Sequence, residues 1–546
     1  MPGLADAFEL IGDAAEHVLP QTHSPGVALS VTDAEETLGV VVRGFADVAA
    51  QAPIRPETRF EIGSISKQFA AIIVLQEVEA GRLDLHVSVN DLLPSLRIAE
   101  PFGPITLHHL MTHTSGLPIG TEESPTGPGA LAILRTLEPT FRPGERFHYS
   151  NDGYKTVGAI LEHVTGTPMH DLLRERILKP LGMRHSEGAI TNATRLDIAV
   201  GYGPVFDDRP AHLNHPLAPA KWIVSNTADG AIVSTAIDMA AYARMLLGRG
   251  AALVDGHDVR ILSDAMFDLL TTGHVETDDP HTRYGYGVDV WEREGRRMIG
   301  HSGGMVGYTT LLRLDLDAGL ACSCHYNGSG EKVELTQYAI DVVRATIAGA
   351  PITPMPHPPA PTALPRAREL AGRYVGPRTI DLEATSDGIR MIDGAVGVAL
   401  ERWPDDEEEA EVYLVPHPAL DRYFLRVARD GDGGVREIAH GPDRFAPQGR
   451  TLDAAPAHEP SWEAFVGLYR SNDPWAAAMR VFLRAGRLWL MWPEEGPEAP
   501  LDPLPDGSFA VGERWQPKRI RFDDVVDGRA VVARYNGGRW YRSFED

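Results

Sequence analysis

The residues at 64–67, Ser-Ile-Ser-Lys, place an amine three positions after a hydroxyl. Residues three apart share one face of a helix. Apolar side chains recur at helical spacing through 69–78, and Gly81 is a typical C-terminal signal. A serine needs an adjacent base to become a nucleophile, and a lysine among apolar side chains can lose its proton near neutral pH. We therefore predict Ser64 as nucleophile and Lys67 as its base, on a helix that runs to residue 79.

A second candidate motif is Tyr149-Ser150-Asn151, which lies between a turn at 142–145 and a predicted helix over 152–164. A loop that enters a helix can aim a phenol and an amide into a cleft. The Tyr149 phenol could then relay a proton, and the Asn151 amide could bond a substrate carbonyl. The alternative is a buried tyrosine followed by an Asn or Asp helix cap.

The third motif is His301-Ser302-Gly303-Gly304, which we expect at the entrance to a strand over 308–316. Gly303 and Gly304 would let a substrate backbone approach a sheet edge closely. A backbone N–H of Gly304 could join that of Ser64 as an oxyanion hole. The alternative is a Gly-rich turn that carries a surface histidine.

Taken in this order, the three motifs resemble those of serine β-lactamases of the class C type, DD-peptidases and related esterases, which read S-x-x-K, Y-x-N and [KH]-[TS]-G. The segment at 109–117 and Pro143-Gly144 match the same pattern, and the resemblance covers about residues 20–345. It implies acyl transfer through Ser64, with Lys67 as base and Tyr149 as proton relay. Asn151 and His301 would orient the substrate, and neither a metal nor a cofactor is needed.

Helical and alternating patterns place these motifs in one α/β domain over 1–350. The expected fold is the β-lactamase/transpeptidase-like one, an antiparallel sheet made by distant parts of the chain and flanked by helices. The predicted elements are helices over 4–18 and 333–347 and strands over 27–31, 38–45, 308–316 and 320–326.

A proline-rich stretch at 351–366 reads as a stiff linker. Short runs of alternating apolar and polar residues, separated by Gly and Asp turns, follow it, and this pattern is typical of an all-β domain. Leu370–Tyr374 and Phe465–Tyr469 share a glycine and a tyrosine at the same offsets. We therefore expect two antiparallel β-barrel domains, over 367–455 and 456–546, although a five-residue repeat can also arise by chance.

Two features point to one branch of the superfamily. The third motif begins with His301, which can be neutral, whereas a lysine there would suit a substrate carboxylate. The domain layout also resembles bacterial D-aminopeptidases, in which a loop of the last barrel supplies an acidic group for the substrate amine. The best candidate here is the acidic loop 494–507, with Asp502 first and Asp506 and Glu498 behind it. The alternative is an acidic loop that faces solvent.

The resemblance implies a serine aminopeptidase that releases N-terminal D-residues such as D-alanine from peptides, amides and esters. An esterase or D-amino-acid amidase on the same core is the nearest alternative. A catalytically silent protein that binds penicillin or peptidoglycan fragments is the alternative from another class. Inhibition by β-lactams and a homodimer are further expectations of the family.

A formal net charge of −25 argues against nucleic acid and against an anionic membrane surface as partners. The N-terminus lacks the basic and apolar regions of a secretory signal, and no apolar run is long enough to span a membrane. We therefore expect a cytoplasmic protein. Cys322 and Cys324 lie two apart on a predicted strand, so we expect two packed side chains rather than a metal site.

Overall fold

The chain divides into two compact units. Unit 1 comprises Met1–Gly203 and Leu217–His357, and unit 2 comprises Pro204–Pro216 and Pro358–Asp546. The computed structural model describes residues 3–120, 127–136, 138–330, 333–355, 362–364, 366–386, 388–403, 411–493, 496 and 498–544.

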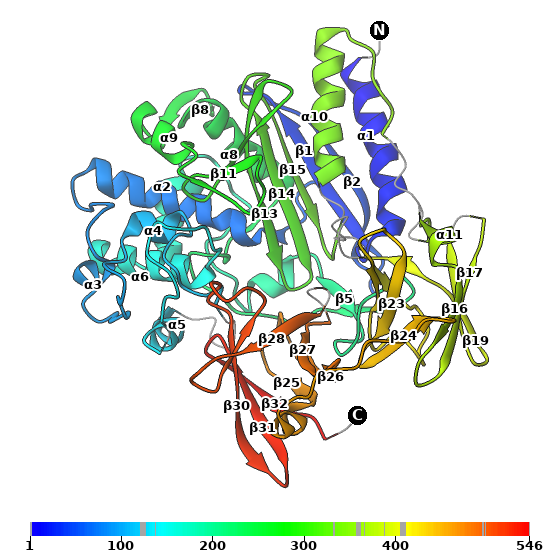
Figure 1. Ribbon diagram of the computed structural model, residues 1–546. Coiled ribbons are helices and arrows are strands. Elements are labelled where there is room, and N and C mark those ends of the chain that lie inside the picture. Colours follow the sequence, from blue (N-terminus) through cyan, green and yellow to red (C-terminus); the bar gives the residue numbers. More distant parts are fainter. Residues whose placement is uncertain are drawn as a thin grey trace. The chain divides into compact units, whose positions relative to one another are not determined.

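Unit 1 is built on a nine-stranded antiparallel sheet in the order β10-β11-β12-β13-β14-β15-β1-β2-β3 (Figure 1). β1, near the N-terminus, pairs with β15, so that Val27 lies opposite Tyr326. Distant parts of the chain thus form one sheet, as predicted. Its strands are β1 (Gly26–Thr32), β2 (Thr37–Asp47), β3 (Ala52–Pro53), β10 (Val275–Glu276), β11 (Thr282–Tyr284), β12 (Asp289–Arg293), β13 (Arg296–Met305), β14 (Tyr308–Asp315) and β15 (Leu320–Tyr326).

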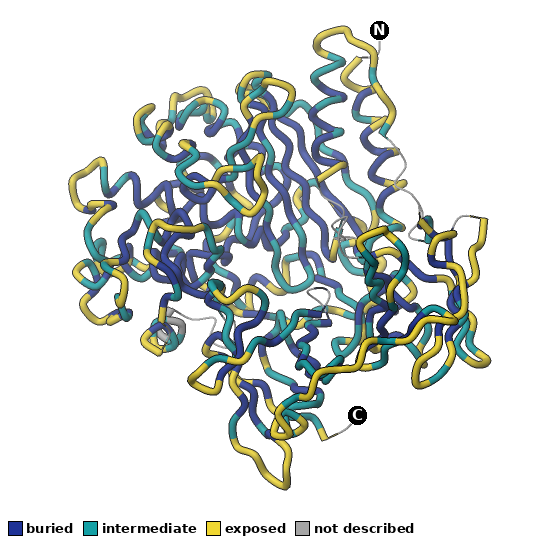
Figure 2. The backbone as a smooth tube through the Cα atoms, viewed as in Figure 1, coloured by how far each residue is buried: buried dark blue, intermediate teal, exposed yellow. Residues whose placement is uncertain are grey.

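Helices cover both faces of this sheet, which explains why every residue of β1 and β15 is buried (Figure 2). The helices α1 (Leu4–Val18) and α10 (Val333–Ala348) lie side by side on one face (Figure 1). Cys322 and Cys324 are buried in the core beneath them. The other face carries a larger apolar core, and the longer helices that contribute to it are α2 (Ser66–Glu79), α6 (Asn151–Thr165) and α8 (Ala236–Leu247).

Shorter elements complete unit 1. The helices are α3 (Val89–Leu92), α4 (Leu107–Met111), α5 (Gly127–Leu134), α7 (Met169–Leu173) and α9 (Asp264–Leu270), and the paired short strands are β4 (Phe60–Glu61) with β7 (Val233–Ser234), β5 (Tyr202–Pro204) with β6 (Leu217–Pro219), and β8 (Ala251–Val254) with β9 (His257–Arg260). Within the described residues, no helix has the length and apolar character needed to cross a bilayer.

The C-terminal part of unit 2 contains two antiparallel β-structures. The first is a nine-stranded sheet whose terminal strands in the sheet order, β19 and β20, are separated in the chain only by Leu400. The sheet is therefore barrel-like. Its strands are β16 (Gly372–Val375), β17 (Thr379–Ala384), β18 (Ile389–Asp393), β19 (Val396–Ala399), β20 (Glu401–Arg402), β21 (Val412–Leu414), β22 (Leu425–Arg429), β23 (Val435–His440) and β24 (Asp443–Pro447), and the short helix α11 (Ala367–Leu370) precedes them.

The second structure is a closed eight-stranded barrel, so the predicted combination of a β-lactamase-like α/β domain and barrel-like C-terminal sheets is confirmed. Its strands are β25 (Gly467–Arg470), β26 (Ala478–Arg484), β27 (Arg487–Met491), β28 (Ala499–Pro503), β29 (Phe509–Val511), β30 (Arg519–Val526), β31 (Arg529–Tyr535) and β32 (Gly538–Arg542).

The segment 494–507 is not one continuous loop, because β28 lies inside it. Leu501 is buried in the barrel core, and Asp502 lies on the strand, where its carboxylate pairs with Arg487 of β27. The prolines at 500 and 503 indicated a loop here, because proline is disfavoured inside a strand. Glu494, Glu495 and Pro497 lie outside the described residues.

The Glu498 carboxylate forms a buried ion pair inside unit 2. Its oxygens lie 3.2 and 3.3 Å from the guanidinium of Arg484, and Arg426 lies 3.4 Å away. The Glu498 side chain has no exposed surface, and that of Arg484 is 6% exposed. Glu498, one of the acidic residues predicted to bind substrate, therefore forms an ion pair with a buried arginine.

Glu498→Ala should lower the free energy of unfolding of unit 2 by about 3–5 kcal/mol, because it strands a buried guanidinium without its counter-charge. Asp506→Ala is the matched control, since the Asp506 carboxylate bonds only within its own turn, to Ser508. The control should change stability by no more than about 0.5 kcal/mol. Urea unfolding followed by tryptophan fluorescence measures both variants, and equal effects would contradict the assigned role of Glu498.

Candidate active site

Ser64 and Lys67 lie at the start of the helix that the sequence predicted. Ser64 belongs to a 3₁₀ turn over Gly63–Ile65, and Lys67 occupies the first turn of α2. The Lys67 Nζ lies 2.9 Å from Ser64 Oγ, 2.8 Å from Asn151 Oδ1 and 2.8 Å from the carbonyl oxygen of Asp229. The lysine is fully buried.

The three oxygens around Lys67 differ in what they can do. The Asn151 Oδ1 and the Asp229 carbonyl only accept hydrogen bonds, whereas the Ser64 hydroxyl can also donate one. A neutral amine has two N–H bonds, and the two acceptors would take both of them. Its lone pair then points at the Ser64 hydroxyl, so this geometry suits a base that removes the serine proton.

Gly63, directly before Ser64, has a left-handed backbone with φ of 54°. A Cβ there would lie 2.4 Å from the carbonyl oxygen of Gly304, and a Cβ on Gly303 would lie 2.0 Å from that of Ile62. The glycines therefore let β13 pack directly against the turn that carries the nucleophile. The His301 motif lies inside β13, paired with β14, and not at the entrance to β14 as expected; the alternative of a Gly-rich turn is wrong.

The Tyr149 ring lies beside the lysine, with its centroid 5.0 Å from Lys67 Nζ. Burial raises the pKa of the Tyr149 phenol, although a hydrogen bond with Ser64 partly offsets this. The phenol therefore keeps its proton at neutral pH and can donate it, while Lys67 is the group placed to act as base.

Ser150 caps α6 by accepting a hydrogen bond from the Gly153 N–H at 3.1 Å. The serine between the two candidate residues thus satisfies the helix end, and Asn151 is not needed as a cap. Its side chain turns to Lys67 instead. The alternative that Asn151 or Asp152 serves as the cap is wrong.

A chain of hydrogen bonds fixes the tautomer of His301. The Ser150 N–H donates to His113 Nδ1 at 3.0 Å, so that nitrogen carries no proton. Burial holds the pKa of His113 well below its usual range, so the ring is neutral and its Nε2–H donates to the Tyr284 oxygen at 3.2 Å. The Tyr284 O–H must then donate to His301 Nε2, 2.8 Å away.

His301 consequently accepts at Nε2 and donates from Nδ1 to the carbonyl oxygen of Ser302, 2.5 Å away. This pattern holds the imidazole neutral beside Ser64. The sequence offered His113 only as part of the matched segment 109–117, and it offered no signal for Tyr284. The two residues meet His301 only in the folded sheet.

A cavity of about 480 Å³ opens in front of these groups. It is lined by Ser64, Phe147, Tyr149, Thr277, Asp278, Asp279, Thr282, Tyr284, Asp289, His301, Ser302 and Gly304. Asp289 begins β12, opposite Gly300. Burial raises the pKa of its carboxyl to about 7, and the charge of Arg313 partly opposes the shift. Sequence reasoning missed this carboxylate, because nothing in its local pattern separates it from other surface acids.

The sheet, its helical layers and the Ser–Lys–Tyr cluster are those of the β-lactamase and penicillin-binding class of proteins. The sequence profile of the Beta-lactamase family matches residues 9–344, and the chain belongs to that family.

Penicillin-binding protein 4 of Amycolatopsis lactamdurans is 29% identical over 369 residues, which cover 64% of this chain and 93% of that protein. Among solved structures, an octameric penicillin-binding protein homologue from Pyrococcus abyssi is 24% identical, with a TM-score of 0.57 over 80% of this chain and 99% of that one. A D-stereospecific amidohydrolase from Streptomyces is 22% identical, with a TM-score of 0.50 over 64% of this chain and all of that one. These two likenesses establish the fold.

Tyr284→Phe should lower kcat/KM roughly tenfold, since it removes a hydrogen bond worth about 1.5 kcal/mol that holds the His301 ring. The ¹⁵N chemical shifts of labelled histidines should show His301 as the Nδ1–H tautomer in the wild type and as a mixture in the variant. Tyr286→Phe is the matched control, because it removes a similar bond, from the Tyr286 hydroxyl to His108 Nδ1 at 2.8 Å. An unchanged His301 signal in Tyr284→Phe would refute the proposed chain.

Proposed function

We propose that this protein is a serine hydrolase of the aminopeptidase type, which releases an N-terminal D-residue such as D-alanine from small peptides, amides and esters through an acyl-enzyme. One observation carries the proposal. The cavity lined by Ser64, whose Oγ lies 2.9 Å from Lys67 Nζ, is also lined by a half-buried carboxylate, Asp289, and a histidine held neutral, His301.

The mechanism follows from the hydrogen bonds around Ser64. Lys67 takes the Ser64 proton, and Ser64 Oγ attacks the substrate carbonyl carbon. The N–H groups of Ser64 and Gly304 receive the negative charge on the carbonyl oxygen. Tyr149 passes a proton to the leaving amine as the C–N bond breaks. Water then attacks the acyl-enzyme with the same groups and regenerates Ser64.

The substrate's free amine needs a negative partner, and Asp289 is a half-buried carboxylate on the cavity wall. An ammonium group beside it would favour the ionised form and so would bind better above a pH of about 7 than below it. Asp502, predicted from the family layout, has Arg487 as its partner on the neighbouring strand. It stays a prediction that Asp502 contributes to amine binding.

The D-configuration rests on the resemblance to D-aminopeptidases, and the name of the similar Streptomyces amidohydrolase is compatible with it. An esterase or D-amino-acid amidase would use the same groups with less need for a free amine. A silent binding protein would acylate at Ser64 without turnover. Substrate panels separate these alternatives.

Ser64→Ala should abolish both turnover and labelling by a fluorescent penicillin while the protein stays folded. Lys67→Arg should be nearly as damaging, because arginine stays protonated and cannot act as base. Labelling is read on denaturing gels, and turnover is read with a chromogenic anilide. More than about a hundredth of the wild-type rate in Ser64→Ala would exclude the assignment, because loss of a nucleophile costs several powers of ten.

The proposed specificity is tested with p-nitroanilides of D-Ala, L-Ala and N-acetyl-D-Ala. We expect the wild type to prefer D-Ala, and its kcat/KM should rise with pH through about 7 as Asp289 ionises. Asp289→Asn should reduce the preference for free over acetylated amine by about ten- to a hundredfold, the worth of a charge-assisted hydrogen bond.

Asp502→Asn is measured in the same panel. If it alone removes the amine preference, Asp502 is the partner and the role of Asp289 is wrong. Equal use of free and acetylated substrates by the wild type would favour the esterase. Acylation without release of p-nitroaniline would favour the binding protein.

A further inference from the structure

Unit 2 receives a short piece of chain from the middle of the sequence. The strands β5 and β6 form a hairpin, and its tip, 204–216, belongs to unit 2 although the residues on either side belong to unit 1. The tip carries His212 and His215, both buried. A turn brings the two residues together, because the His215 N–H donates to the His212 carbonyl at 2.9 Å.

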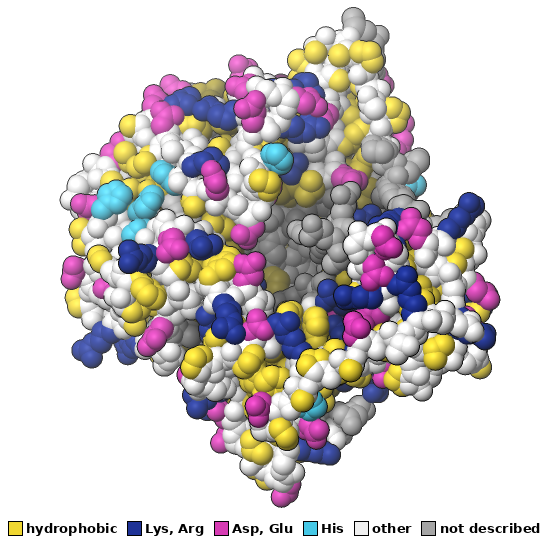
Figure 3. Space-filling model, in the orientation of Figure 1, with side chains coloured by type: hydrophobic (Ala, Val, Ile, Leu, Met, Phe, Trp, Pro, Cys, Tyr) yellow, Lys and Arg dark blue, Asp and Glu magenta, His cyan; other side chains and the backbone are white. Residues whose placement is uncertain are grey.

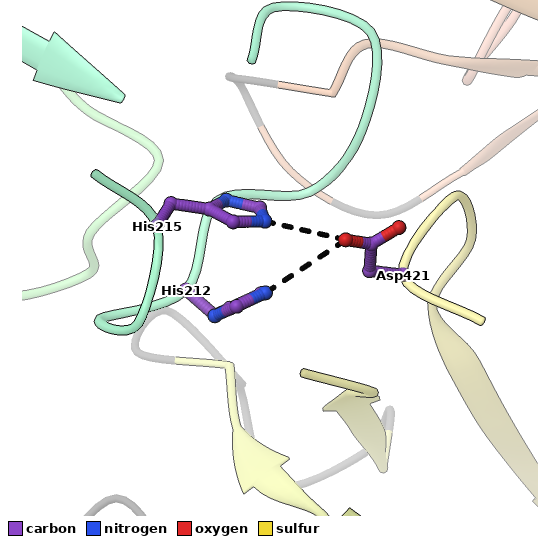
Figure 4. A group of neighbouring side chains, drawn as sticks. All are labelled: His212, His215 and Asp421. Carbon is purple, nitrogen blue, oxygen red and sulfur yellow. Dashed lines mark hydrogen bonds and ion pairs between the residues drawn. The ribbon is translucent and has the colours of Figure 1, made fainter. Parts of the chain in front are cut away.

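Both imidazoles face one carboxylate oxygen (Figure 4). The Nε2 of His215 lies 3.3 Å from Asp421 Oδ2, and the Nε2 of His212 lies 4.0 Å from the same atom. Asp421 is in the segment between β21 and β22, so all three residues belong to unit 2. The three ligand atoms lie within 4.8 Å of one another.

We propose that His212, His215 and Asp421 bind a divalent transition-metal ion, best matched by Zn²⁺, as a structural site in unit 2. Nitrogen and oxygen atoms bound tetrahedrally to zinc at 2.0–2.1 Å lie about 3.3 Å apart. The His215–Asp421 separation already has this value, and the His212–Asp421 separation exceeds it by less than an ångström. Two imidazoles and a carboxylate are ligands that zinc accepts readily.

The two imidazoles are packed against each other, with ring centroids 3.6 Å apart, as two ligands of one ion can be. The exposed fractions are 5% for the His212 side chain, 4% for that of His215 and 3% for that of Asp421, so the ligands are already desolvated.

Arg209 orients the carboxylate. Its guanidinium donates to the other oxygen, Asp421 Oδ1, at 3.0 Å, which leaves Oδ2 for the ion.

The site would hold the hairpin tip 204–216 on unit 2. It takes no part in the chemistry at Ser64, which needs no metal. The proposal therefore stands or falls independently of the proposed hydrolase activity.

The experiment uses the full chain, stripped of metal with a chelator and then titrated with Zn²⁺. We expect one Zn²⁺ per chain by calorimetry and elemental analysis. Co²⁺ bound in its place should show the intense visible bands of a tetrahedral nitrogen and oxygen site. At about a hundredfold excess over Kd, zinc should raise the Tm by roughly 5 °C.

His215→Gln and Asp421→Asn should each weaken zinc binding at least about a hundredfold, since loss even of a supporting residue around a metal costs ten- to a hundredfold. Two variants are used in case one fails to fold, and the wild-type cobalt spectrum needs neither. If both variants misfold, the cobalt spectrum and the stoichiometry of the wild type decide.

A second histidine group provides the matched control. Figure 3 shows histidines gathered on the face of unit 1 near α3 and α4, and ring contacts link His86, His108, His109 and His274 there. His86→Gln should leave the unit 2 site unchanged. The proposal is overturned if the wild type binds no zinc at micromolar concentration, or if His86→Gln removes binding while His215→Gln keeps it.

Discussion

The active site depends on one buried nitrogen, that of Lys67. A buried amine costs several kcal/mol unless its hydrogen bonds are satisfied. Three separate parts of the chain satisfy them: the turn that carries Ser64, the first residue of α6, and the carbonyl of Asp229. The helix α2 lies in the largest apolar core of unit 1, so water cannot replace these partners. The packing of α2 against α6 therefore sets the chemistry of Ser64.

Burial also fixes the protonation of the groups around that nitrogen. It keeps His113 neutral and the Tyr149 phenol protonated. Because His113 is neutral and its Nδ1 accepts from the Ser150 N–H, the ring proton is on Nε2, which donates to the Tyr284 oxygen. The tautomer of His301 on β13 is thus set by His113, through the hydroxyl of Tyr284.

Local patterns were enough to predict the groups that meet within a helix turn or at a helix entrance. Ser64 and Lys67 are three residues apart, in the 3₁₀ turn and the first turn of α2. Tyr149 and Asn151 can both face Lys67 because Ser150 caps α6. The strands β1, β2, β14 and β15 and the helices α1 and α10 were also predictable, because each has a clear period of apolar residues.

Contacts between distant strands were not predictable. Tyr284 and Asp289 have ordinary surroundings in the sequence, and only the order of β11, β12 and β13 brings them to His301. Glycine and proline obscured the strands in two places. Gly303 and Gly304 were expected before a strand but lie inside β13, where glycine lets the strand touch the Ser64 turn, and Pro500 and Pro503 concealed β28. The sequence did not indicate a metal site at His212 and His215, because Asp421 lies 206 residues after His215 and approaches the two histidines only in the folded chain.

The electrostatics of the cavity favour a substrate that brings its own positive charge. Among the described residues that line it, there is no lysine or arginine, and the histidine on its wall is held neutral. A substrate carboxylate would therefore find no fixed cation and would face Asp289. An ammonium would instead neutralise Asp289, whose raised pKa shows that burial leaves its charge poorly compensated. The proposed preference for an amine over a carboxylate rests on this burial, because a carboxylate charge kept from water needs a partner in the cavity.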